Sequence, residues 1–253
     1  MAEVNFTVQD GIAIIEINRP EARNAVNNAV AQGLADAMDQ LDARDDLRVG
    51  ILTGAGGTFC AGMDLKAFLK GEKVIFEGRG FAGFVEAPPK KPLIAACEGY
   101  VLAGGFELAI TCDLIVASSE TKFGIPEVKR GLVAAAGGVI RLPRQIPPRI
   151  AMEMALTGDF VSAQRMEQYG LINRIVEPGK TLEAAIALAK TIAANGPLAV
   201  ATSKRLVKES EDWSTAEMFR KQDEIVAPIF TSEDAKEGAT AFAEKRPPVW
   251  KGR

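Results

Sequence analysis

Short apolar runs alternate with amphipathic segments along the first half of the chain. Apolar runs bounded by glycine, proline or asparagine are typical of buried strands, and apolar residues three or four apart indicate one face of a helix. These signals predict strands at residues 11–17, 49–53, 92–97 and 113–117. They predict helices at residues 27–43 and 104–111. Strands that alternate with helices are typical of the α/β class.

The second half, from Pro143 onward, is patterned mainly as helices. We predict helices at residues 150–156, 162–169, 182–194 and 198–209, with one short strand at residues 172–176. Gly196-Pro197 is the clearest interruption, and a proline is favoured at the start of a helix. We therefore predict a core domain over residues 1–195 and a helical C-terminal region over residues 196–253. Residues 66–92 have no clear period and are predicted to form a loop with a mobile helix.

Composition removes several kinds of chemistry. The 253 residues include no histidine, which excludes Ser-His-Asp and Cys-His nucleophile systems and histidine metal sites. Cys60, Cys97 and Cys112 form no C-x-x-C pair, so we expect neither a bound metal nor a disulfide framework. Catalysis would have to come from carboxylates, lysine, tyrosine, backbone amides or a bound cofactor.

Charge and hydropathy do not indicate a nucleic-acid or membrane partner. The formal net charge of -3 gives no basis for attraction to nucleic acid or anionic lipid. No apolar run approaches the roughly 20 residues of a membrane-spanning helix, and the first residues do not follow a signal-peptide or transit-peptide pattern. We expect a cytoplasmic protein without nucleic-acid or membrane partners.

Three glycine-bearing segments follow the predicted strands at residues 49–53 and 92–97. Residues 54–57 fail the dinucleotide-binding pattern, because Phe59 stands where the third glycine belongs, and we interpret them as a tight turn. Near Met63 and Gly104, glycines lie where a strand yields to a helix or loop and backbone N–H groups lack partners. Two such amides aimed at one point stabilise a developing oxyanion. The same turns also serve packing alone, so both interpretations stay open.

Two glutamates are set among apolar neighbours. Glu107 lies early in the predicted helix at residues 104–111, and Glu127 follows Pro126 in the segment Phe-Gly-Ile-Pro-Glu. An acid at a helix start commonly acts as a cap or dipole partner. An acid with apolar neighbours tends to have a raised pKa, which suits proton exchange near neutral pH. A pair of such acids could activate a water and deliver a proton.

Several motifs occur together and in a fixed order. They are N-R-P-x-x-x-N-A, F-x-A-G-x-D-L, G-x-x-x-A-G-G-x-E-L-A, C-D-x-x-x-A and F-G-x-P-E, starting at Asn18, Phe59, Gly99, Cys112 and Phe123. Their combination resembles the enoyl-CoA hydratase/isomerase (crotonase) family over nearly the whole chain. The resemblance implies a crotonase-like spiral of ββα units, with residues 1–195 as its core and residues 196–253 as a helical trimerisation region. It also implies an acyl-CoA substrate, a homotrimer or dimer of trimers, and no cofactor, since coenzyme A is part of the substrate.

The resemblance also implies roles for individual residues. The amides of Met63 and Gly104 would form the oxyanion hole. Glu107 and Glu127, 20 residues apart as in the family's hydratases, would hold a water, one taking its proton and the other protonating C2. The path for coenzyme A and its pantetheine arm would be lined by Ala22, Arg23, Ala25, Ala61, Asp64, Leu65 and Lys66. Lys245 would reach the nucleotide end of coenzyme A from a neighbouring subunit.

Hydration of a trans-2-enoyl-CoA, or its reverse, is the activity that this resemblance favours. Residues 80–84, 104–109 and 138–143 and the tail from residue 232 are also similar to the carnitinyl-CoA dehydratase branch. Residues 131–138 lack the proline and polar residues often found there, so the resemblance does not identify the acyl group of the substrate. An isomerase would need only one of the two acids, and a non-catalytic acyl-CoA-binding protein would need neither. A nucleotide-binding role usually comes with a basic stretch, and Lys90-Lys91 is too short for one.

Overall fold

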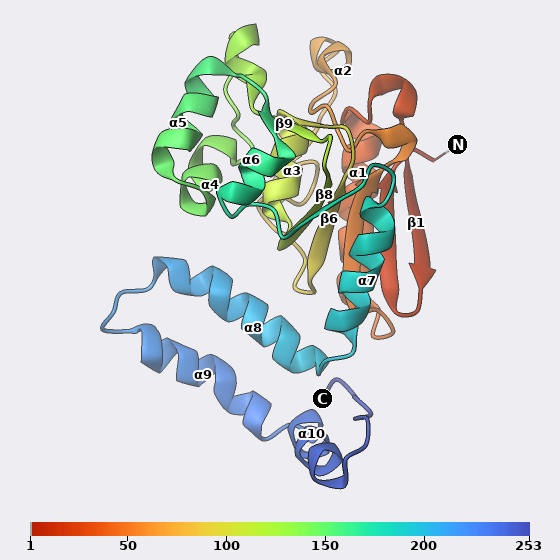
Figure 1. The fold of residues 1–253 in the computed structure, drawn as a ribbon, viewed down its shortest axis with the longest axis vertical. Helices are drawn as coiled ribbons and strands as arrows, with labels where there is room; N and C mark the ends of the chain where they lie inside the picture. The colour runs from red at the N-terminus through yellow and green to blue at the C-terminus, as the bar shows by residue number, and fades with distance from the viewer. Residues whose placement is uncertain (1) are drawn as a thin grey trace.

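The computed structural model describes residues 2–253, and its centre is a six-stranded sheet in the order β1-β2-β3-β6-β8-β11 (Figure 1). Its strands are β1 (Val4–Gln9), β2 (Ile12–Ile17), β3 (Val49–Gly54), β6 (Leu93–Cys97), β8 (Leu114–Ser118) and β11 (Arg174–Val176). β1 runs antiparallel to β2, and every other neighbouring pair is parallel. Five of these strands were predicted from apolar runs, as expected for parallel strands that are buried on both faces.

β1 is the strand of this sheet that the sequence prediction missed. Val4, Phe6 and Val8 alternate with polar residues, which is the pattern of a half-buried strand. Asp10 and Gly11 then turn the chain into β2 with φ values of 53° and 75°. Two successive positive φ angles at Asp-Gly are typical of a two-residue hairpin, so the signal for β1 was present in the sequence.

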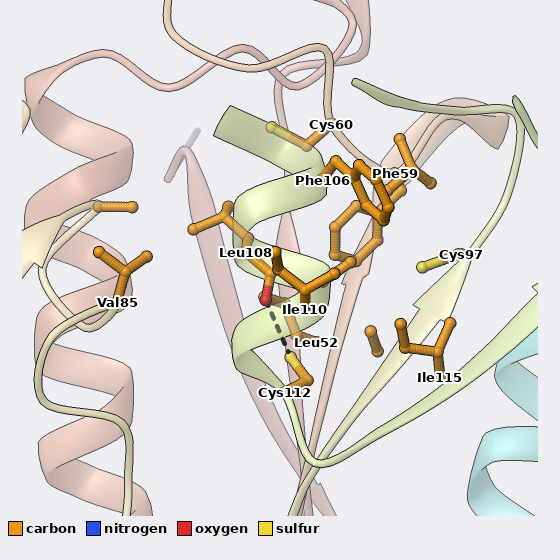
Figure 2. Packing of buried hydrophobic residues seen from close by; sticks show 14 of the residues in the cluster. Leu52, Phe59, Cys60, Val85, Cys97, Phe106, Leu108, Ile110, Cys112 and Ile115 are labelled. Atoms are coloured by element: carbon orange, nitrogen blue, oxygen red, sulfur yellow. Dashed lines mark hydrogen bonds between the residues drawn. The ribbon is translucent and has the colours of Figure 1, made fainter. Parts of the chain in front are cut away.

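Helices cover both faces of the sheet. α1 (Asn28–Ala43) and α3 (Gly104–Thr111) pack on one face, where the larger apolar core lies. α7 (Thr181–Ala193) covers the other face with Ala185 and Ala189 fully buried. Figure 2 shows Phe106, Leu108 and Ile110 of α3 in the middle of the larger core. α3 is buried along its whole length, which explains its almost uniformly apolar sequence.

Two smaller sheets and a set of short helices complete the core. One small sheet has the order β10-β9-β7, from Val161–Ser162, Lys122–Gly124 and Tyr100–Leu102. The other is a hairpin of β4 (Ile75–Phe76) and β5 (Gly80–Phe81), preceded by α2 (Leu65–Leu69). The segment predicted as a loop with a helix therefore also contains a hairpin, and its mobility stays a prediction. The other helices of this part are α4 (Gly138–Gln145), α5 (Pro148–Thr157) and α6 (Ala163–Gln168).

The C-terminal helices extend away from the sheet (Figure 1). They are α8 (Pro197–Glu209), α9 (Met218–Phe230) and α10 (Glu233–Glu244), and neither α8 nor α9 has a buried residue. Lys204 of α8 fixes them to the core, because its ammonium group pairs with Asp113 at 2.7 Å and donates to the carbonyls of Pro89 and Lys91. The division of the chain at residue 196 stays a prediction.

Between residues 2 and 253, no single helix has both the length and the apolar character to cross a membrane. One pair of helices, residues 181–193 and 197–212, has the length and composition of a membrane span when the two are taken together, but the pair is bent by 108° at its break.

Candidate active site

Two neighbouring strands lead into the candidate site. β7 and β9 are parallel and in register, with Tyr100 opposite Lys122 and Leu102 opposite Gly124. The N–H of Ala103 donates to the carbonyl of Gly124 at 2.8 Å and continues the pairing beyond the strands. α3 begins just after β7, and the 3-10 helix η3 (Pro126–Arg130) begins just after β9. The two glutamates, 20 residues apart in sequence, are therefore carried by adjacent strand ends.

The backbone amides of Met63 and Gly104 lie at one edge of a cavity. Gly62, directly before Met63, has a φ of 99°, and a Cβ on it would lie 3.0 Å from the nitrogen of Gly104. Among residues 2–253, neither the Met63 nor the Gly104 amide donates to a backbone or side-chain acceptor. Ala103 has a φ of 52°, an uncommon value for a residue with a Cβ, and such strain is often found at functional sites. Both amides are thus available to a ligand oxygen.

Glu107 is held in place by the chain around it. Its side chain is buried in the first turn of α3, and Oε1 accepts a hydrogen bond from the N–H of Gly138 at 2.7 Å. Burial raises the pKa of this carboxyl group above its usual range, while the amides of Gly138 and Ala136 and the charge of Arg141 act in the opposite direction. A Cβ on Gly138 would lie 2.9 Å from the Cβ of Ala134 and 3.0 Å from Oε1, so any larger residue here would require these neighbours to shift.

Arg141 lies behind Glu107, one turn into α4. Its guanidinium group donates to Thr111 Oγ1 at 3.0 Å and to the carbonyl of Val85. Thr111 in turn donates to the carbonyl of Glu107 at 2.8 Å. Burial lowers the pKa of Arg141, while the charges of Glu107 and Glu86 raise it. Arg141 therefore places a fixed positive charge near Glu107 and links α3 to α4.

Glu127 has a looser environment. It is half-buried at the start of η3, and burial raises its pKa to about 7, with a further contribution from the negative charge of Glu107. Its Oε2 atom is buried and has no hydrogen-bond partner within the described part of the chain. A carboxyl group with this pKa exchanges protons near neutral pH, and an unpaired buried oxygen can accept a hydrogen bond from a bound water or substrate.

A cavity of about 920 Å³ connects these groups. Glu107, Glu127, Met63 and Gly104 all contribute to its wall. So does Arg23, whose guanidinium carbon lies 5.9 Å from the centre of the Tyr100 ring. The volume lies in the range of pockets that bury most of a drug-sized ligand. Oxyanion donors beside two acids of raised pKa form an arrangement that can stabilise an enolate and move protons to and from adjacent carbons.

The structure places the remaining predicted site residues in three ways. Ala61 and Leu65 line the cavity with Arg23, whereas Ala22, Ala25, Asp64 and Lys66 do not. The Asp64 carboxylate accepts from the Lys66 and Ala67 amides as the N-cap of α2 and pairs with Arg19 at 3.2 Å. Lys245 is the C-cap of α10, and α10 and α2 lie at opposite ends of the molecule (Figure 1). Within one chain, Lys245 is therefore not brought to the cavity.

Sequence reasoning missed some of the groups that shape the site. Gly138 and Arg141 contact α3 across about 30 residues of sequence, and no local pattern indicates such a contact. The N-cap role of Asp64 had a signal, because an aspartate directly before a short apolar segment commonly caps a helix.

Comparison with known proteins identifies the family of this chain. The chain matches the family described as enoyl-CoA hydratase/isomerase over residues 7–253. The structure of enoyl-CoA hydratase EchA1 from Mycobacterium marinum superposes with a TM-score of 0.98 at 63% identity, covering 100% of both chains. Enoyl-CoA hydratase EchA19 from Mycobacterium tuberculosis is 42% identical over 95% of this chain and 93% of that protein. Carnitinyl-CoA dehydratase from Proteus mirabilis is 40% identical over 99% of this chain and 98% of that protein. The chain is thus a member of the enoyl-CoA hydratase/isomerase family and has its crotonase-like fold.

Proposed function

We propose that this protein is an enoyl-CoA hydratase, a hydro-lyase that adds water across a trans-2-enoyl-CoA thioester. The observation that carries the proposal is that one cavity is lined by two acidic side chains and by two backbone amides that donate to no acceptor in the described chain. The names of the relatives described above support the same reaction class. No cofactor is needed beyond the coenzyme A that the substrate carries.

In the proposed reaction, the thioester oxygen accepts hydrogen bonds from the Met63 and Gly104 amides. One carboxylate takes a proton from water, and the water oxygen forms a bond to C3. The electron pair of the C2–C3 double bond moves to C2 and is delocalised onto the thioester oxygen as an enolate, which the two amides stabilise. The other carboxyl group then gives its proton to C2. Addition of H and OH from the same side follows if both acids lie on one face of the substrate.

The pair of acids favours hydration over the two other activities considered. An isomerase that shifts a double bond needs one acid to carry a proton, and a non-catalytic acyl-CoA-binding protein needs none. Here Glu127 has a pKa of about 7 and Glu107 is fixed by backbone amides. Carnitinyl-CoA dehydration uses the same elementary steps on a different acyl group. It is the second candidate because a protein of that name matches 99% of this chain.

We further propose a cytoplasmic homotrimer or dimer of trimers, in which Lys245 of one subunit reaches the coenzyme A bound to another. Large apolar side chains exposed on the C-terminal helices support an assembly, since Val207, Phe219, Phe230 and Phe242 are all at least 65% exposed in the single chain. Light scattering of the purified protein is expected to give the mass of three or six chains, and the mass of one chain would contradict the proposal.

The activity can be tested by following the enoyl absorbance of crotonyl-CoA as it is hydrated. Glu107→Gln and Glu127→Gln are each expected to lower kcat by about 10²–10⁴-fold, the usual contribution of a general acid or base. Binding of butyryl-CoA, measured by calorimetry, should be largely retained. Glu167→Gln, at an exposed position on α6, is the matched control. Full activity in both active-site variants would exclude the two-acid mechanism.

A further inference from the structure

The oxyanion turn, residues 60–64, carries the Met63 amide, and its two ends are held unequally. At its start, the N–H of Cys60 donates to the carbonyl of Tyr100 at 3.1 Å, and the carbonyl of Cys60 accepts from the N–H of Leu102 at 3.0 Å. At its end the chain passes into α2, in which four of the five residues are exposed. The direction of the Met63 N–H therefore depends on the contacts that the end of the turn makes with the core.

Val26 is the backbone partner of Met63, in an isolated parallel bridge. The N–H of Val26 donates to the carbonyl of Gly62 at 2.8 Å. This carbonyl and the Met63 N–H belong to one planar peptide group, in which they point in opposite directions. A hydrogen bond that fixes the Gly62 carbonyl therefore also fixes the direction of the Met63 N–H.

The same relation holds one peptide group further from the cavity. The carbonyl of Ala25 and the N–H of Val26 share a peptide group, and Nη1 of Arg19 donates to that carbonyl at 2.6 Å. A chain of hydrogen bonds thus runs from Arg19 through two peptide groups to the Met63 N–H, with every group oriented the same way. Hydrogen bonds aligned in this way polarise one another, so the guanidinium donor at the start of the chain strengthens the donor at its end.

Two carboxylates hold the guanidinium group of Arg19. Asp64 Oδ2 accepts from both Nη1 and Nη2 at 3.2 Å, and Glu3 Oε2 lies 3.4 Å from Nε. The side chains of Arg19 and Asp64 are only 14% and 16% exposed, so this pair is little screened by salt and water. Burial raises the pKa of Asp64, but the hydrogen bonds that it accepts from backbone amides and from Arg19 lower the pKa more, so this carboxyl group stays charged.

Neither Arg19 nor Asp64 lines the cavity, so both must act through other groups. Asp64 follows Met63 directly and caps α2 with Oδ1, which leaves Oδ2 for Arg19. Arg19 consequently contacts the chain on both sides of the bridge, at the carbonyl of Ala25 and at the carboxylate of Asp64.

We propose that Arg19 is a positioning residue of the oxyanion hole, which orients and polarises the Met63 N–H through these two peptide groups. Asp64 holds the guanidinium group in place for that task, which differs from the coenzyme A contact predicted from the sequence. The donor at Gly104 needs no such support, because it lies at the start of a buried helix whose dipole acts in the same sense. The inference rests on the proposed function, in which the two amides stabilise an enolate.

Kinetics with crotonyl-CoA give the first test. Removing one oxyanion-hole donor typically costs about 10²–10³-fold in kcat, and a donor that is kept but misdirected should cost less. Arg19→Met is expected to lower kcat by about tenfold to hundredfold. KM should change much less, because the enolate depends on this donor more than the substrate does. An unchanged kcat, or a loss confined to KM, would overturn the proposal.

Asp64→Asn separates the positioning role from helix capping. Asparagine caps a helix as well as aspartate does, so α2 should be retained while the charge that holds Arg19 is lost. We expect kcat to fall by about threefold to tenfold. In the double variant with Arg19→Met the two losses should not add, since both act on one chain of hydrogen bonds. Arg19→Lys keeps a cationic donor and should restore part of the loss, whereas fully additive losses would exclude the link between the two residues.

The carbonyl stretch of a bound thioester reports the oxyanion hole without turnover. Butyryl-CoA labelled with ¹³C at the thioester carbon has no double bond to hydrate, and the two amides should move its carbonyl band to lower wavenumber than in the free thioester. In Arg19→Met the band should move back toward its free position. Arg79→Met is the matched control, because Arg79 likewise donates to a carbonyl, that of Gly83 at 2.7 Å, and to the carboxylate of Asp39 at 2.9 Å, outside the cavity lining. It should lower stability and leave the band in place.

The two readouts separate this inference from the proposed function. A band that is shifted in the wild type and moves back in Arg19→Met, with no hydration of any enoyl-CoA, would reject the hydratase function and retain the positioning role. Hydration of crotonyl-CoA with the same band in the wild type, Arg19→Met and Asp64→Asn would reject the positioning role alone. Activity lost only in proportion to unfolded protein would likewise reject it, since Arg19 would then be a structural ion pair.

Discussion

The two sides of the cavity are built differently. On one side, α3 is buried along its whole length, and Glu107 accepts a hydrogen bond from the Gly138 amide near the positive charge of Arg141. On the other side, η3 has no buried residue. It carries Glu127, whose Oε2 atom has no hydrogen-bond partner in the described chain. The difference indicates a division of tasks. The α3 side holds Glu107 in a hydrogen bond, whereas the η3 side leaves the Glu127 Oε2 atom without a partner in the described chain.

The largest expected effect comes from a substitution in α3, on the packed side of the cavity. A Cβ at position 105 would lie 2.2 Å from the carbonyl oxygen of Cys60, a contact between α3 and the turn before Met63. Gly105→Ala must push these two segments apart, and we expect a loss of about 3 kcal/mol in the free energy of unfolding. Urea unfolding at a fixed protein concentration measures it, and hydration of crotonyl-CoA should fall with it.

A glycine on the open side provides the control for that variant. Gly131 has a φ of 69°, and a Cβ there would meet nothing within 4 Å. Gly131→Ala is expected to cost about 1 kcal/mol, from the left-handed backbone alone. If the two alanine variants were equally destabilised, the contrast between a packed side and an open side would be wrong.

The next effect in size is a pH dependence that belongs to Glu127. Its pKa is about 7 in the folded protein against an ordinary value of 4.5, so the folded state holds this proton more tightly than the unfolded state. Its stabilising contribution is complete below pH 4.5 and is lost as pH rises through about 7. The free energy of unfolding of wild type minus that of Glu127→Gln should therefore decrease across this window. A flat difference would show that Glu127 is not buried as described.

The smallest effect concerns the charge behind Glu107. Arg141→Met removes a positive charge that lowers the pKa of Glu107, so that pKa should rise. Infrared difference titration of the carboxyl band in the Glu127→Gln background reports Glu107 alone among the two acids. Arg141→Lys keeps the charge and should restore most of the change. A loss of stability without a shift of the Glu107 pKa would show that Arg141 acts only as a link between helices.

The buried elements were the most predictable parts of the fold. The helix expected at residues 104–111 is α3 (Gly104–Thr111), because its glycine start and its apolar sequence both mark its limits. The strands at β3 and β6 follow equally clear apolar runs. β7 and β9 were missed because β7 lies between Gly99 and Gly104, in a segment that was interpreted as a turn, and β9 contains a single apolar residue, Phe123.

The same distinction holds for the site. The motifs identified Glu107, Glu127, Met63 and Gly104 as candidates, and all four line one cavity. The roles of Gly138 and Arg141 could not be read from the sequence, since they depend on how α4 packs against α3. The rest of the cavity wall likewise combines residues from α2, the β4–β5 hairpin and the segment after η3, which only the folded chain brings together.

The register between β7 and β9 has a consequence for how this chain can diverge. Because Leu102 pairs with Gly124, backbone hydrogen bonds fix the position of Gly104 relative to Glu127 along the strands. Replacing a side chain leaves these hydrogen bonds intact. A single inserted or deleted residue in either strand would instead turn its side chains to the opposite face. Residues 131–137 lie outside that pairing, so they can change in length and composition while the spacing between Gly104 and Glu127 is kept.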